Sequence, residues 1–178
     1  MKLLDDIKRY FYKSTISQRA EGLKVVRKIT NLNDAKTIGI IYDSSNPNHD
    51  VSVTKFSETL RGKGKTVEIL GFLNDKKIDH KEDILIFNLN DVNWYGIPNS
   101  KRVDDFCNKE FDLLLCLFSE EVLPLEYIAF FSKAKYRVGA FDATKTSFYD
   151  LMIKTDIKKD MNYLIQQMIH FLNNIKYA

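Results

Sequence analysis

Five apolar runs of strand length, spread along the chain, constrain its fold more than any other feature. They lie at residues 37–42 (TIGIIY), 66–72 (TVEILGF), 83–89 (DILIFNL), 111–118 (FDLLLCLF) and 136–141 (YRVGAF). A strand with one solvated face alternates apolar and polar residues, whereas these runs are apolar almost throughout. The pattern therefore predicts a mainly parallel sheet of about five strands that is covered on both faces.

Helical segments separate most of these strands, as expected of alternating strand and helix units. One helix is expected to begin at Asp50, as its N-cap, and to end at the glycines at positions 62 and 64. Shorter helices are expected after Ser100 and from Pro124 to about Lys133. A long C-terminal helix is expected to begin at Asp156.

These elements together predict one Rossmann-like, three-layer α/β domain over residues 35–178. Residues 74–83 are too polar and too few for a packed helix, so a loop is expected there. Strand order and direction around residues 74–98 stay open. Residues 1–34 are predicted to be an additional basic helical segment outside this domain.

Positive charge is concentrated in the first 28 residues, where eight lysines and arginines against three acids give a net charge of +5, compared with +3 for the whole chain. Apolar residues recur at helical spacing through Phe11, and Ser14, Thr15 and Ser17 interrupt the pattern, which we expect to resume through Val26. The candidate contact residues are Lys8, Arg9, Lys13, Arg19, Lys24, Arg27 and Lys28. Such a segment suits a protein or ribonucleoprotein partner, RNA or an anionic membrane. It equally suits a helix packed outside the sheet with solvated lysines.

The loop after the first strand, DSSNPNHD (43–50), is the strongest candidate for a ligand site. Ligands of open parallel sheets bind beyond the carboxyl ends of the strands, and the start of the next helix favours an anion. The candidate ligand-binding residues are Asp43, Ser44, Ser45, Asn46 and Asn48, with Asp142 converging on them after the fifth strand and Ser119, Glu120 and Glu121 after the fourth. The loop has no glycine, so it matches neither a P-loop nor a dinucleotide fingerprint. The alternative is an ordinary strand-to-helix turn.

Other features argue against several classes of function. There is no G-x-S-x-G motif, and Cys107, Cys116 and three scattered histidines predict neither a metal site nor a disulfide framework, so no metal and no cofactor are expected. No apolar run approaches the roughly 20 residues that a membrane span needs. Trp94, the single tryptophan, either forms an aromatic contact patch or packs over the edge of the core.

Five short motifs lie between the first strand and the fifth: KTIGI (36–40), NW-x-G (93–96), FDLLL (111–115), PL-x-YI (124–128) and AK-x-RVG (134–139). With the basic N-terminal helix, they resemble an uncharacterised family of small Bacteroidota proteins over nearly the whole chain. That family is a domain of unknown function, so the resemblance implies no catalytic residues.

Two further resemblances are local. TIGIIYDSSNPN resembles the strand and loop of ABC-type substrate-binding protein lobes. The succession from DLLLCLF to AKYRVG is similar to the acceptor half of heptosyltransferase-type enzymes. Both imply a Rossmann-like topology, and fold alone does not fix function.

The sequence thus favours a cytoplasmic, non-catalytic binding or scaffold protein that engages a protein or ribonucleoprotein partner through its basic N-terminal helix. One alternative is a small-ligand-binding protein or phosphate-ester-processing enzyme with its site around residues 43–48. The other alternative is an RNA-binding protein. The oligomeric state is not predicted.

Overall fold

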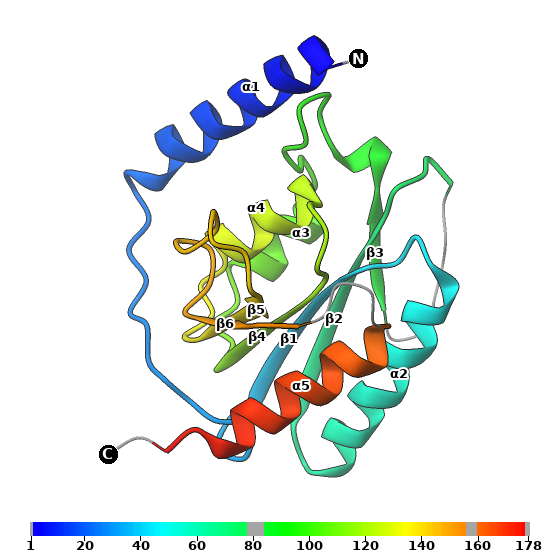
Figure 1. Cartoon of the computed structure of the whole chain (residues 1–178), viewed down its shortest axis with the longest axis vertical. Coiled ribbons are helices and arrows are strands. Elements are labelled where there is room, and N and C mark those ends of the chain that lie inside the picture. The colour runs from blue at the N-terminus through cyan, green and yellow to red at the C-terminus, as the bar shows by residue number, and fades with distance from the viewer. Residues whose placement is uncertain (1, 78–83, 156–159, 177–178) are drawn as a thin grey trace.

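In the computed structural model, which describes residues 2–77, 84–155 and 160–176, six parallel strands form one open sheet in the order β3-β2-β1-β4-β5-β6 (Figure 1). The strands are β1 (Thr37–Asp43), β2 (Thr66–Leu73), β3 (Leu85–Asn88), β4 (Leu113–Leu117), β5 (Arg137–Ala140) and β6 (Leu151–Ile153). The predicted Rossmann-like α/β class is confirmed, with one strand more than expected.

Chain order and strand order together place a switch point between β1 and β4. From β1 the chain passes through α2 (Pro47–Gly62) to β2 on one side, whereas β4, β5 and β6 are added on the other side. The helix that follows β1 and the helix that follows β4, α4 (Leu123–Phe131), pack on opposite faces of the sheet. The carboxyl ends of β1 and β4 therefore flank the position at which open α/β sheets bind ligands.

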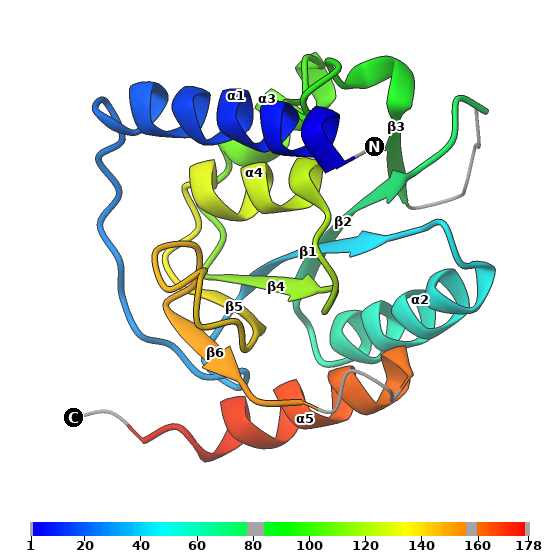
Figure 2. The same cartoon turned by 45° about the horizontal axis from the view of Figure 1, so that its top comes forward.

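Helices cover both faces of the sheet, as the continuous apolar strands predict (Figure 2). α2 and α5 (Met161–Asn174) share one core with Ile40 and Leu115. α3 (Lys101–Cys107) and α4 share the other core with Ile41 and Cys116. A short 3₁₀ helix, η1 (Leu89–Asp91), follows β3. Successive residues of one strand enter opposite cores, which explains why β1 and β4 are apolar at nearly every position.

α1 (Lys2–Ala20) lies outside α4 as an additional layer (Figure 2). Tyr12 and Ile16, one turn apart, are buried in the core that α4 also enters. The hydroxyl of Thr15 donates to the carbonyl of Phe11 at 2.9 Å, so the helix accommodates this hydroxyl residue without a break. The expected interruption and the resumption through Val26 are both wrong, because one helix ends at Ala20 and residues 21–36 contain no helix or strand.

Several element boundaries differ from the prediction. Asp156, the expected start of the last helix, lies outside the described residues, and α5 begins at Met161 in the structure. α4 ends at Phe131, slightly before the expected Lys133. β6 was not predicted because three residues are too few for a periodic signal. β3, whose direction was open, runs parallel to β2.

Candidate functional site

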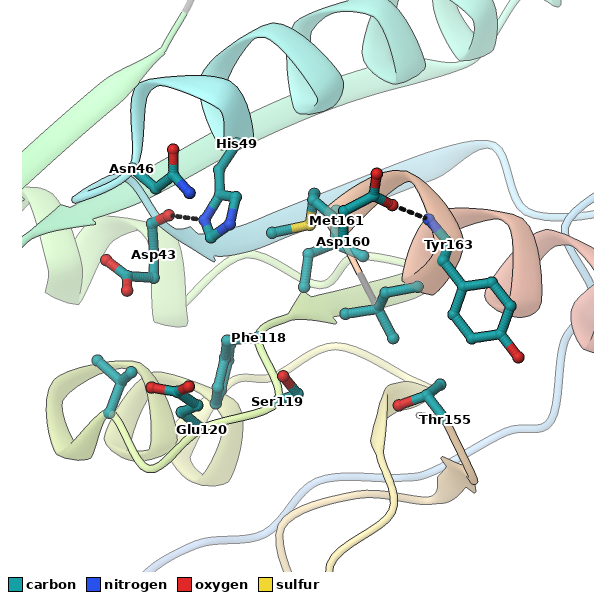
Figure 3. Close-up of a pocket in the computed structure, with 13 residues that line it drawn as sticks. Asp43, Asn46, His49, Phe118, Ser119, Glu120, Thr155, Asp160, Met161 and Tyr163 are labelled. Atoms are coloured by element: carbon teal, nitrogen blue, oxygen red, sulfur yellow. Dashed lines mark hydrogen bonds between the residues drawn. The ribbon is translucent and has the colours of Figure 1, made fainter. Parts of the chain in front are cut away.

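A cavity of about 260 Å³ opens at the carboxyl ends of β1 and β4 (Figure 3). The loops after β1, β4 and β6 and the first turn of α5 contribute to its lining. Phe118 and Met161 supply part of the apolar lining. The polar residues that line the cavity are Asp43, Asn46, His49, Ser119, Glu120, Thr155, Asp160 and Tyr163.

The loop between β1 and α2 is held in place by its own serines. Ser44 is buried, and its hydroxyl donates to Oδ1 of Asp50 at 2.7 Å, where Tyr42 also donates at 2.6 Å. Oγ of Ser45 accepts the backbone N–H of Asn74, in the loop after β2, at 3.0 Å. Neither serine is among the described residues that line the cavity, so the structure gives both a role in fixing the loop.

α2 is capped by Asn46. Oδ1 of Asn46 accepts the backbone N–H of Asn48 at 3.0 Å, and Pro47 occupies the first helical position, which its fixed φ suits. The prediction that Asp50 is the N-cap is therefore wrong, because the cap is Asn46, four residues or just over one turn earlier. Asn48 is exposed and is not among the described lining residues of the cavity.

His49 is oriented by the backbone of the same loop. Its Nδ1 lies 2.8 Å from the carbonyl oxygen of Asp43 (Figure 3). A carbonyl oxygen only accepts hydrogen bonds, so Nδ1 is the protonated nitrogen, and Nε2 of the neutral ring is an acceptor. The sequence analysis did not select His49. The available signal was its position, three residues after the cap of a helix that begins at the carboxyl end of β1.

Negative charge dominates the lining. Asp43, Glu120 and Asp160 contribute carboxylates, and among the described lining residues His49 alone takes a positive charge. Asp160 also caps α5, accepting the backbone N–H of Tyr163 at 2.9 Å. The start of α2 adds a partial positive charge to a lining that contains three carboxylates. The arrangement disfavours an anion and favours groups that donate hydrogen bonds to carboxylates.

A second cavity, of about 490 Å³, adjoins the first on the side of α1. Asp43 and Val122 line both cavities, so the two form one extended crevice along the strand ends. Lys8 and Arg9 of α1 line the second cavity, and Arg9 forms an ion pair of 2.6 Å with Glu121, in the loop after β4. The N-terminal helix thus forms part of the wall of the strand-end crevice.

Asp142 belongs to a separate cluster. Its carboxylate accepts hydrogen bonds from the backbone and the hydroxyl of Thr144, which lower its pKa, and lies 3.4 Å from Nζ of Lys145. Lys145 also forms an ion pair of 2.5 Å with Glu126; burial raises the pKa of Glu126, and Lys145 partly offsets this effect. Asp142 is not among the described residues that line either cavity.

The N-terminal arginines are engaged with the body of the protein. Nη1 of Arg19 donates to the hydroxyl of Tyr127 at 2.6 Å. Arg27 donates to the carbonyl oxygens of Ala134 and, at 3.1 Å, Ser132. Among the side chains that the structure describes, the exposed lysines of the segment are Lys13, Lys24 and Lys28.

Trp94 packs on α1 while staying largely exposed. The exposed fraction of Trp94 is 62%, and its ring centroid lies 5.4 Å from that of Phe11. Oδ1 of Asn93 accepts the backbone N–H groups of Tyr95 at 3.2 Å and Ile97 at 2.9 Å, which fixes the loop. The tryptophan thus packs against an exposed residue of α1 and not over the edge of the core, and its role in a contact patch stays a prediction.

Within the part of the chain that the structure describes, no group of three or more His, Cys, Asp or Glu residues could hold a metal ion. No helix in the same part is long and apolar enough to cross a membrane.

Fold and site together define a Rossmann-like α/β protein with a crevice at the switch point of its sheet. The model of a family described as "Family of unknown function (DUF6913)" matches residues 8–175, and the chain belongs to that family. The expected membership of an uncharacterised family is thus confirmed. The Bacteroidota origin and the likeness to ABC-type lobes stay predictions. No curated protein matches the chain.

Among solved structures, the chain is similar to the glycosyl transferase family 9 protein from Veillonella parvula DSM 2008. The sequence identity is 14% and the TM-score is 0.46. The match covers 75% of this chain but only 41% of that protein.

Proposed function

We propose that this protein binds a small hydroxyl-rich or cationic molecule in the strand-end cavity. The observation that carries the proposal is that Asp43, the first turn of α2 with His49, and the loop after β4 with Glu120 line one cavity of about 260 Å³ at the switch point. Drug-sized ligands occupy sites of roughly 300–1,000 Å³. A molecule the size of a monosaccharide or an amino sugar fits a cavity slightly below that range.

The lining matches the hydrogen-bonding needs of such a molecule. The carboxylates of Asp43 and Glu120 accept from hydroxyl or ammonium groups, and Nε2 of His49 is a further acceptor. The hydroxyl of Thr155 both donates and accepts. The same carboxylates repel a phosphate, so the phosphate-ester alternative has less support than a neutral or cationic ligand.

The prediction that the basic N-terminal segment engages a protein, a ribonucleoprotein or RNA also has less support. Tyr12 of α1 is only 3% exposed, and it lies in the same core as α4. Arg9 and Arg19 are paired with groups of the body, which leaves fewer cations for phosphate contacts.

Thermal unfolding with defined compounds tests the proposal. Glucose, glucosamine and spermidine are compared with glucose 6-phosphate and ATP at equal concentrations. A ligand at 100 times its Kd stabilises a protein by about 2.7 kcal/mol. For a chain of this size that shift is roughly 5–10 °C in Tm. We expect a neutral or cationic compound to raise Tm and the phosphorylated compounds to have no effect.

Two variants connect any shift to the cavity. Asp43→Asn and Glu120→Gln should each reduce the shift, because each removes a charged acceptor from the lining. Glu58→Gln, an exposed residue of α2 outside the lining, is the matched control and should respond like the wild type. An equal shift in Glu120→Gln, a shift only with phosphorylated compounds, or no shift at all would contradict the proposal.

A further inference from the structure

The outward side of α1 carries apolar side chains that the fold does not cover. Tyr12 and Ile16 lie on the side of the helix that packs against the body. At helical periodicity, the exposed apolar residues fall within an arc of roughly 120° on the other side. They are Leu3, Leu4, Ile7, Tyr10 and Phe11. Figure 2 shows α1 as the outermost element of this part of the molecule.

Trp94 extends this apolar surface. Its ring centroid lies 5.4 Å from that of Phe11, which in turn lies 5.7 Å from that of Tyr10. We call the surface formed by these three aromatic residues with Leu3, Leu4 and Ile7 the outer face of α1. Trp94 comes from the loop between η1 and α3, so the outer face includes a residue of the α/β body.

The basic residues of the N-terminal segment differ in their surroundings, and Lys8, like Arg9, lines the second cavity. Arg9 and Arg19 point to groups of the body, whereas Lys13 is exposed and makes no hydrogen bond or ion pair within the described residues. Lys24 and Lys28 are exposed in the segment after α1. Lysine stems lie along apolar surfaces while their amino groups reach for phosphates, which is the arrangement of side chains at a membrane interface.

We propose that the outer face of α1 seats on an anionic lipid surface. The leucines and Phe11 enter the boundary between headgroups and acyl chains, Trp94 lies at headgroup level, and Lys13 contacts lipid phosphates. α1 lies in the plane of the interface, since it is not apolar enough to cross. Protein interfaces are depleted in lysine, and nucleic acid offers no apolar medium for Leu3 and Leu4, so both occupants fit the outer face less well.

Trp94 reports directly on this contact, because it is the only tryptophan of the chain. The full-length protein is titrated with phosphatidylcholine vesicles, with and without phosphatidylserine, and Trp94 fluorescence and co-sedimentation are measured. We expect a blue shift and co-sedimentation with the anionic vesicles only. High salt should weaken both, because it screens the lysine contribution.

Matched variants distinguish binding through the outer face of α1 from nonspecific hydrophobic adsorption to vesicles. The double substitution Leu3→Ser with Leu4→Ser should weaken binding at least about tenfold, because two apolar side chains no longer leave water. Lys13→Gln should weaken it about fivefold. Val51→Ser with Phe171→Ser removes two apolar residues that are exposed elsewhere, on α2 and α5, and should bind like the wild type. Leu3 and Leu4 are about 70% exposed, so their substitution should leave Tm nearly unchanged, whereas Phe171 is 45% exposed and its substitution should lower Tm by a few degrees. All variants are therefore compared at a temperature where each is folded.

The proposal is overturned by an absence of binding to anionic vesicles, by equal binding to neutral ones, or by equal losses in the two double variants. Two other occupants have their own signatures. A change of Trp94 fluorescence that follows protein concentration without vesicles indicates a second copy of the chain. A change with RNA but not with vesicles indicates nucleic acid. Either result also overturns the proposal.

Discussion

Replacing Tyr12 tests whether α1 is a fixed part of the molecule. Tyr12 is 3% exposed, and its hydroxyl donates to the carbonyl oxygen of Leu123, at the start of α4, at 2.9 Å. Tyr12→Phe removes this bond and leaves the carbonyl without that donor, so we expect a loss of about 1–2 kcal/mol in the free energy of unfolding. Tyr12→Ala also removes a buried ring, which typically costs about 3–5 kcal/mol.

Tyr10→Ala is the matched control for Tyr12→Ala. It changes the same residue type in the same helix, but Tyr10 is 70% exposed, so its expected effect lies within about 0.5 kcal/mol. The free energies are measured by urea unfolding, and hydrogen exchange of the α1 amides shows whether the helix alone is released. Equal effects of the two substitutions would refute the docking of α1 described above.

Alkaline pH gives an independent check on Tyr12. Burial, followed by the nearby charges of Glu126 and Glu121, raises the pKa of Tyr12 above its usual range. A folded-state pKa above the unfolded value of about 10 means that the associated stability is complete below pH 10 and declines as pH rises towards the folded value. The advantage of the wild type over Tyr12→Phe should therefore shrink above about pH 10. An advantage that stays constant there would contradict the burial of this hydroxyl.

Three further substitutions have expected outcomes that urea unfolding measures. Gly139→Ala should lower the free energy of unfolding by about 1–3 kcal/mol, because the new Cβ would lie 2.5 Å from Cε1 of the buried Tyr149 ring. An unchanged free energy would mean that the ring moves aside freely. Burial acts to raise the pKa of Asp112, but hydrogen bonds from Lys135 and two backbone N–H groups outweigh it and lower the pKa. Asp112→Asn should therefore lower the free energy of unfolding by about 1–2 kcal/mol at pH 7. Below about pH 4 the carboxylate of the wild type becomes protonated and its stabilising contribution is lost, so the difference between wild type and variant should shrink; a difference that does not depend on pH would contradict this. Asp160→Ala should lower the free energy of unfolding by about 1 kcal/mol through loss of the α5 cap, and an unchanged value would show that another group caps the helix.

The sheet was predictable because its strands are buried on both faces. Ile40 and Ile41 enter opposite cores, so burial makes successive residues apolar and the run stands out in the sequence. The loop after β1 was predictable for the same reason, since parallel strands place their carboxyl ends at one edge. β6 escaped detection because three residues give no pattern, and Thr155, which follows it, was missed with it.

The other candidate site residues are oriented by hydrogen bonds close to them in the chain, which residue spacing alone does not predict. Asp50 was taken as a cap because it precedes an apolar helical stripe, but Tyr42 and Ser44 hold its carboxylate at the end of β1. Asp142 and Asp43 both follow strands and both accept the backbone N–H of the residue two positions on, but only Asp43 is among the described residues that line the cavities. Spacing along a sequence identifies the edge of a sheet, whereas the direction of each side chain there is set by its local hydrogen bonds.

The apolar pattern of α1 shows how periodicity alone misleads. The residues at helical spacing in its first half include Leu4 and Phe11, which are exposed, whereas the buried contacts come from Tyr12 and Ile16. α1 thus has two apolar sides, and only the side with Tyr12 and Ile16 packs against the α/β body. No described residue of α1 lines the proposed ligand cavity, so the two proposals can be tested separately. Tyr10→Ala alters the outer face and should reduce vesicle binding while ligand binding stays intact. Tyr12→Ala loosens the base of the outer face, so it should also reduce vesicle binding, and ligand binding should persist wherever the α/β body stays folded.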